Sequence, residues 1–239
     1  MTSHEALLMA VPAVVALVGG VVAALWHPSA RARSLIQHFA AGVVLAALAV
    51  ELLPEIEREH APGLVLGLSF ALGSAFMFGL KLLTERIESR PGGREGADLG
   101  LLLATFIDVA VDGFIIGAGF AAGGETGPIL AIGLSVELLF LGLALTSETP
   151  GGLRIVGISG ALGVTVFLSA AAGKILLSGA PKAVIGGALA FAAAALLYLV
   201  TEELLVEAHS GKERETPIAT LVLFGGFLAF WAVQLSGRT

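Results

Sequence analysis

Three acidic residues lie deep inside long apolar stretches of this 239-residue chain. Asp108 and Asp112 are four positions apart, so on a helix they share one face, and Glu137 lies in the next apolar stretch. A carboxylate in the hydrocarbon interior of a membrane costs about 3 kcal/mol or more. No Lys or Arg lies at the same depth to neutralise the three acids, so a metal ion, protons or both must offset their charge.

The composition indicates that these stretches cross a membrane. The chain is 56% hydrophobic and 13% charged, with a mean hydropathy of +0.95, whereas about 25% of the residues of a soluble domain are charged. We therefore expect an all-α integral membrane protein. The net charge of −6 argues against a nucleic-acid partner, and the absence of cysteine excludes disulfides and thiolate metal sites.

Eight stretches are long enough to cross the bilayer, which takes about 20 apolar residues. The segments between them carry Pro, Gly or charge, and none is long enough for a second domain, so residues 1–239 are predicted to form one transmembrane domain. The first stretch lacks a positive leading region and is read as a span, not a cleaved signal. The predicted spans are 6–25, 35–54, 64–84, 99–121, 128–147, 153–176, 182–206 and 217–235.

The distribution of Lys and Arg predicts the orientation. Eight spans place both termini on one side; nine of the 13 basic residues fall on the opposite side and four on the side of the termini. The positive-inside rule then places both termini on the non-cytoplasmic side.

The depth of the three acids predicts that they meet. Asp108 lies about 14 Å into the span that begins near Leu99, close to the middle of the hydrocarbon core, and Glu137 lies equally deep in the next span. A short connection makes the two spans antiparallel neighbours. The alternative is that the acids are protonated and hydrogen-bond between helices.

A second set of acids lies at helix ends. Glu51 and Glu55 end one span, and Glu203 and Glu207 repeat this pattern 152 residues later, on the opposite face of the membrane. An inverted repeat of spans 1–3 and 6–8 around spans 4–5 would produce this arrangement. Alternatively, these glutamates face headgroup water. His38, near the cytoplasmic end of its span, is either a packing residue or part of an ion pathway.

Several of these segments resemble the ZIP family of divalent-metal transporters. Residues 35–55, LIQHFAAGVVLAALAVELLPE, resemble the family pattern H-x-x-A-G…L-L-P-E, and residues 196–209, LLYLVTEELLVEAH, resemble a later family helix. The resemblance implies eight spans in a 3+2+3 arrangement, with repeats at about 6–84 and 153–235 around a central pair at about 99–147. It also implies a homodimer in the plasma membrane that imports zinc by alternating access, with spans 1, 4, 5 and 6 moving against the others.

The central pair departs from the family pattern. In DVAVDG, Asp108 takes the position of the family's His and Asp112 that of its Glu; in ELLFLG, Glu137 keeps a ligand, whereas Leu138 and Leu141 replace two acids. This predicts one metal site where the family has two. Three carboxylates suit Mn²⁺, Fe²⁺ or Mg²⁺, while the resemblance implies Zn²⁺.

Together these features predict a transporter of divalent metal cations, with the ion as substrate and no cofactor. The ion would pass Glu51 and Glu55, bind to the three central acids, and leave towards Glu203 and Glu207. One alternative is a proton-coupled transporter of another solute. Another is a non-transporting relative that acts as a metal sensor or partner. An intramembrane enzyme is disfavoured because the chain has no G-x-S-x-G motif and only His38 lies near a span interior.

Overall fold

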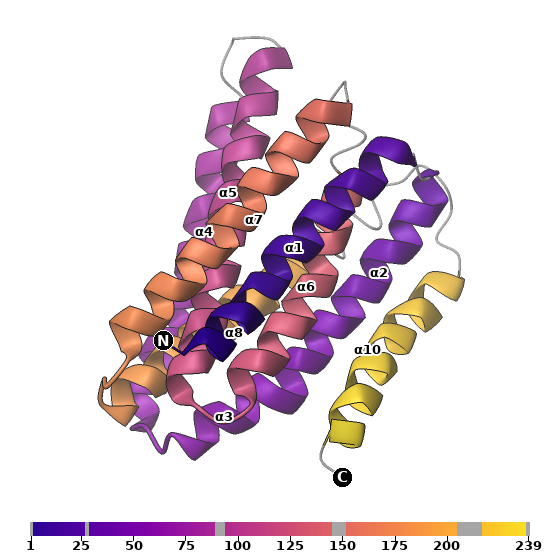
Figure 1. Ribbon diagram of the computed structural model, residues 1–239. Helices are drawn as coiled ribbons and strands as arrows, with labels where there is room; N and C mark the ends of the chain where they lie inside the picture. The colour runs from indigo at the N-terminus through magenta and orange to yellow at the C-terminus, as the bar shows by residue number, and fades with distance from the viewer. Residues whose placement is uncertain (1, 27–28, 89–93, 145–151, 205–216, 238–239) are drawn as a thin grey trace.

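The structure is a computed structural model that describes residues 2–26, 29–88, 94–144, 152–204 and 217–237. These residues form a bundle of helices and contain no strand (Figure 1). The helices are α1 (Ser3–Leu25), α2 (Ala30–Ala47), η1 (Leu48–Leu52), α3 (Leu53–Arg58), α4 (Gly63–Glu88), α5 (Arg94–Ala122), α6 (Thr126–Ala144), α7 (Gly152–Leu177), α8 (Lys182–Leu199), η3 (Val200–Leu204) and α10 (Pro217–Gly237).

Seven helices in the described ranges are long and apolar enough to cross a membrane. An all-helical chain with seven such helices is a multi-pass membrane protein, as the composition predicted. The predicted span 128–147 coincides with α6, whose apolar part, Thr126–Gly142, is shorter than the other seven. Residues 145–147 lie outside the described residues, so the count of eight spans stays a prediction.

The second predicted span ends later than expected. The helix does not stop at Pro54 but passes through η1, a π-helical turn, into α3, which ends at Arg58. Pro54 has no N–H to donate within this turn, and the side-chain Nε2 of Gln234 donates to the nearby carbonyl of Val50 at 3.3 Å. A side chain from a distant helix thus hydrogen-bonds to the main chain of the π-helical turn.

The two helices that carry the repeated acids match in length. Each bound of α8 lies 152 residues after the corresponding bound of α2, and each is followed directly by a five-residue π-helical turn, η1 or η3. The offset is the one that separates the two acidic motifs in the sequence. The sequence did not predict the π-helical turns, because a change from i→i+4 to i→i+5 hydrogen bonding has no simple residue signature.

Glycines let pairs of helices pack through their main chains. α10 packs against α2, where a β-carbon on Gly42 would overlap the carbonyl oxygen of Leu223, and one on Gly226 would overlap that of Phe39. α4 packs against α8 in the same way at Gly73. Such close approach is the usual reason for small residues at helix contacts in membranes.

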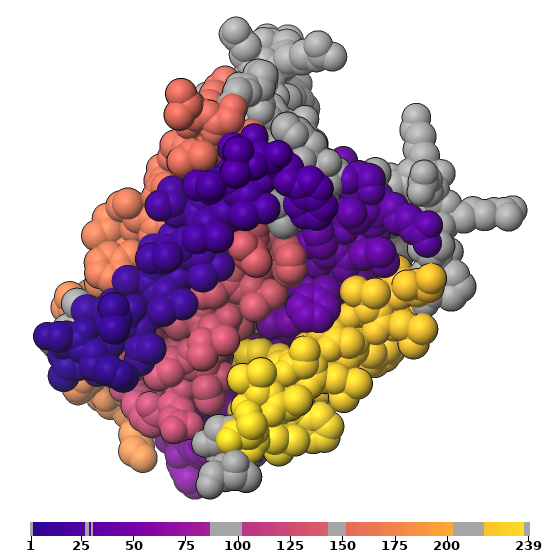
Figure 2. All heavy atoms as spheres, turned by 45° about the vertical axis from the view of Figure 1, so that its right-hand side comes forward, coloured from indigo at the N-terminus to yellow at the C-terminus, as the bar shows by residue number. Residues whose placement is uncertain are grey.

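These main-chain contacts divide the bundle into three sets: α1, α5, α6 and α7; α2 with α10; and α4 with α8. We call the first set the α1 group, and the two pairs together the α2 group. Wherever a β-carbon added to a described glycine would touch the main chain of another helix, that helix belongs to the same group. Gly133 of α6 lies against the other group, and there it meets only side chains. Figure 2 shows α6 between α1 on one side and α2 and α10 on the other.

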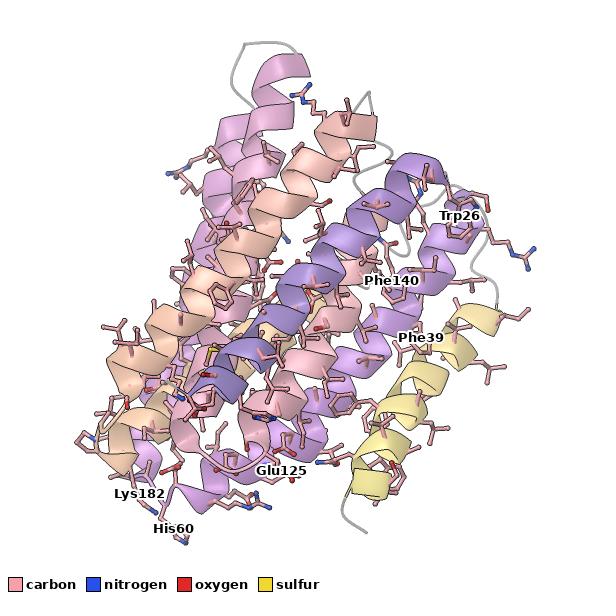
Figure 3. The ribbon with its side chains drawn as sticks, viewed as in Figure 1. Trp26, Phe39, His60, Glu125, Phe140 and Lys182 are labelled. Atoms are coloured by element: carbon pink, nitrogen blue, oxygen red, sulfur yellow. The ribbon has the colours of Figure 1, made fainter. Side chains whose placement is uncertain are left out.

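Both termini lie towards the end of the bundle that carries α3, which we call the terminal end (Figure 1). His60, Glu125 and Lys182 mark this end in Figure 3, whereas Trp26 lies at the opposite end. Glu125 precedes the first residue of α6, so α6 starts at the terminal end and runs away from it. Depth along each helix can therefore be counted from this end.

Candidate functional site: a buried carboxylate cluster

The two helices that carry the central acids are joined by a tight turn. α5 ends at Ala122, and Gly123 and Gly124, with φ of 93° and 62°, reverse the chain before α6 begins. These positive φ values favour glycine, which has no β-carbon to clash with the main chain. Asp108 lies midway along α5, and Glu137 lies in the second half of α6.

The structure brings the three carboxylates together, as the sequence predicted. One oxygen from each of Asp108, Asp112 and Glu137 lies within 4.8 Å of the others, and all three residues are buried, with 8%, 1% and 6% of their surface exposed. Three oxygens that each lie about 2.2 Å from one metal ion in tetrahedral geometry are about 3.6 Å apart. A contraction of at most about 1.2 Å between the oxygens would therefore let all three bind a single ion.

The surroundings of the cluster are apolar and contain no basic residue from its own helices. Residues 102–142 include no Lys or Arg, and Val109, Leu134 and Leu138 beside the acids are buried. The three acids make polar interactions of their own. In a medium of low dielectric constant, carboxylates this close repel each other strongly when ionised, so the site favours a bound cation or shared protons.

The two helices position their acids in similar ways. DVAVDG on α5 and ELLFLG on α6 each have an acid five residues before a glycine. Gly113 lies against the main chain of α7 at Val166, and Gly142 lies against that of α1 at Gly19. In both helices the glycine allows close packing inside the α1 group, and this packing fixes the position of the acid one turn earlier.

Glu51 has different surroundings from those expected at an exposed helix end. It lies in η1, is 5% exposed, and accepts a hydrogen bond on each carboxylate oxygen. Thr126 Oγ1 donates to one oxygen at 2.9 Å, and Gln234 Nε2 donates to the other at 2.7 Å. Glu51 therefore joins the start of α6 to the end of α10.

The other predicted pathway residues have their own local surroundings. Glu55 is buried and pairs with Arg58 at 3.0 Å, and His38 is buried with its Nδ1 donating to the carbonyl of Ser34 at 2.8 Å. Glu203 lies on η3, but the position of its side chain is not described, and Glu207 lies outside the described residues.

Sequence reasoning missed the partners of several charged residues. Thr126 and Gln234 were not singled out, although an amide in the apolar stretch 217–235 is a signal that could have drawn attention. The sequence also does not reveal that Lys174 pairs with Glu5 and Lys81 with Glu202. Pairing between distant helices depends on tertiary packing, which spacing along one helix does not reveal.

Comparison with known proteins adds no assignment. A scan against protein-family models finds no match to this chain, and a search of the curated proteins finds none either. The functional inference therefore depends on the cluster and on the helices that position it.

Proposed function

We propose that this protein transports divalent metal cations across a membrane. The observation that carries the proposal is the convergence of Asp108, Asp112 and Glu137, buried and within 4.8 Å of one another, from two neighbouring helices. Three carboxylates without a basic neighbour on their helices are costly in an apolar setting unless a cation joins them. A buried site in a multi-pass bundle suits an ion in transit.

The architecture we propose is that of a divergent ZIP-family relative. It has eight spans, which are the seven long helices and the shorter α6. They form a 3+2+3 arrangement of inverted three-helix repeats around α5 and α6. The common offset of 152 residues between α2 and α8, and between their π-helical turns, supports the repeat. The motifs on residues 35–55 and 196–209 support the family, and the three-acid cluster is where the chain diverges from it.

The proposed direction is import. With both termini on the non-cytoplasmic side of the plasma membrane, the ion enters past Glu55 and Glu51 and leaves towards Glu203 and Glu207. Zinc is the substrate that the resemblance favours, and Mn²⁺ or Fe²⁺ the one that oxygen ligands favour. In the proposed cycle the α1 group, which carries the cluster, moves against the α2 group, and the protein works as a homodimer.

The experiment that tests this proposal is an uptake assay in proteoliposomes with Zn²⁺, Mn²⁺, Fe²⁺, Mg²⁺ and Cd²⁺ at two pH values. Glu137→Gln should abolish uptake of the preferred ion, whereas Glu57→Gln, on the exposed side of α3, should leave it unchanged. Absence of flux for every ion, with metal binding intact, would favour a sensor. Proton movement with no metal binding would favour a proton-coupled transporter of another solute.

A further inference from the structure

The polar contact at Glu51 joins the two helix groups at the terminal end. Thr126 lies on α6, which belongs to the α1 group. Glu51 lies in η1, directly after α2, and Gln234 lies on α10, so both are on the side of the α2 group. All three are buried, with 5%, 2% and 6% of Glu51, Thr126 and Gln234 exposed. This layer therefore excludes solvent where α2, α6 and α10 meet.

An apolar layer lies deeper between the same helices, four residues away along α2 and α10 and seven along α6. A β-carbon on Gly133 of α6 would lie 3.2 Å from the β-carbon of Ala47 and 3.1 Å from a ring carbon of Phe230. Ala47 and Phe230 each come four residues before the polar residue of their helix, and Gly133 comes four residues before Glu137. The layer thus separates Glu51 from the acid that α6 contributes to the cluster.

We propose that these two layers form a gate that closes the terminal end of the ion route, and that Glu51 opens it by exchanging Thr126 for an arriving cation. This inference rests on the proposed function, because it assigns a role along the same route. The hydroxyl of Thr126 is a neutral donor, and a divalent cation competes with it for the same carboxylate oxygen. Once that hydrogen bond is broken, the contacts that Gly133 of α6 makes with α2 and α10 are contacts with side chains.

Gln234 acts as the positioning residue of the gate. Its Nε2 donates to both Glu51 and the carbonyl of Val50. Because α10 is packed on α2 through the main chain at Gly42, Gln234 moves with Glu51 and not with α6. The gate therefore separates at the Thr126 contact.

The contrast between contacts within and between groups argues that the layers can separate. Inside the α1 group, and between α2 and α10, helices meet at main-chain atoms and cannot slide without a clash. Across the gate, Gly133 meets a methyl group and an aromatic ring, both of which are smooth and have no polar atoms to re-pair. One neutral hydrogen bond contributes a factor of about two to ten to an equilibrium constant.

A disulfide across the apolar layer tests whether the gate must open. The natural chain has no cysteine, so Ala47→Cys with Gly133→Cys creates the only thiol pair, and their β-carbons lie close to the separation that a disulfide requires. Oxidation should stop metal uptake in proteoliposomes, and reduction should restore it. Each single-cysteine variant should be insensitive to oxidant.

The outcomes separate this inference from the proposed function. Normal uptake by the oxidised, fully cross-linked protein overturns the gate, and so does a pair that fails to cross-link. Absence of uptake in the wild type overturns the transport proposal, and the gate is then judged by the labelling experiment below, which needs no flux.

Thiol labelling measures the gate directly. In the chain with Ala47→Cys alone, a membrane-impermeant thiol reagent should react slowly from the terminal end, and about two- to tenfold faster when Thr126→Val removes the hydroxyl. Thr165→Val is the matched control, because its hydroxyl bonds only within α7, to the carbonyl of Ala161. An equal rate in all three proteins would show that the layers are static packing and would overturn the gate.

Discussion

The central cluster and Glu51 are both buried carboxylates, but their neighbours differ in kind. At the cluster, three acids face one another within 4.8 Å. At Glu51, two neutral donors occupy the two oxygens of one acid. Burial is nearly the same, with 5% of Glu51 and 6% of Glu137 exposed.

The difference teaches that burial alone does not identify an ion site in such a bundle. Glu51 is satisfied by the protein itself, so removing its partners should destabilise the fold. The cluster brings like charges together, so neutralising one acid should stabilise the metal-free protein and weaken only its binding of the metal ion. The two regions should thus respond to conservative substitutions with opposite signs, and the predictions below test that difference.

The largest effect is expected for metal affinity. Asp108→Asn with Asp112→Asn should weaken binding of the preferred ion to the purified protein by at least about 100-fold, or about 2.7 kcal/mol, because two of three anionic ligands become neutral. Glu51→Gln should change this affinity less than about threefold. Isothermal titration calorimetry measures both; a loss as large for Glu51→Gln would make Glu51 a ligand and remove the contrast.

Acid pH should weaken binding at the cluster. Protons compete with the metal for the carboxylate oxygens, so affinity should fall as pH falls and recover as it rises. The affinity measured at pH 7 should exceed that at pH 5 by about tenfold or more. If each bound metal displaces one proton, the affinity changes about tenfold for each pH unit over which the carboxyl titrates, and the cluster need titrate over only part of this interval. Affinity that does not change with pH would mean that the ligands lie elsewhere.

The metal-free protein should become more stable when one acid of the cluster is neutralised. Asp112→Asn keeps the shape of the side chain and removes a like charge, which should raise the midpoint of thermal unfolding by an amount that corresponds to about 1–3 kcal/mol. Added metal should raise the midpoint of the wild type and have little effect on the variant. A lower midpoint for the variant would indicate that the protein already satisfies all three acids.

Removing the partner of Glu51 should have the opposite sign. Gln234→Leu keeps the volume of the side chain but removes the donor to Glu51 and Val50, and should lower the unfolding midpoint by an amount that corresponds to about 1–2 kcal/mol. Thr165→Val, whose hydroxyl bonds only within its own helix, is the control and should have almost no effect. A neutral result for Gln234→Leu would mean that water replaces the amide.

The smallest effect is expected at the ion pair between α4 and η3. Lys81 and Glu202 have 41% and 40% of their side chains exposed, and pairs this exposed contribute about 0–1 kcal/mol. A double-mutant cycle with Lys81→Met and Glu202→Gln should give a coupling free energy within that range. A larger coupling would make this pair the counterpart of the Glu51 contact at the other π-helical turn.

The sequence predicted the helices and the cluster because both depend on local patterns. Apolar length located the helices, and the four-residue spacing of Asp108 and Asp112 with the short connection to α6 brought the acids together. The π-helical turns and the contacts of Thr126 and Gln234 with Glu51 were not predicted. They depend on where distant helices meet, as when Gln234 donates to the carbonyl of Val50, 184 positions away.

The glycine contacts also determine how this bundle would tolerate change. Where main chains touch, as at Gly42, a single methyl group displaces an entire helix, and no rearrangement of a neighbouring rotamer can absorb it. Gly225, one residue before Gly226 on the same helix, faces open space, so alanine fits there without contact. Of two adjacent positions on α10, Gly226 should therefore not tolerate substitution by alanine, whereas Gly225 should tolerate it without effect.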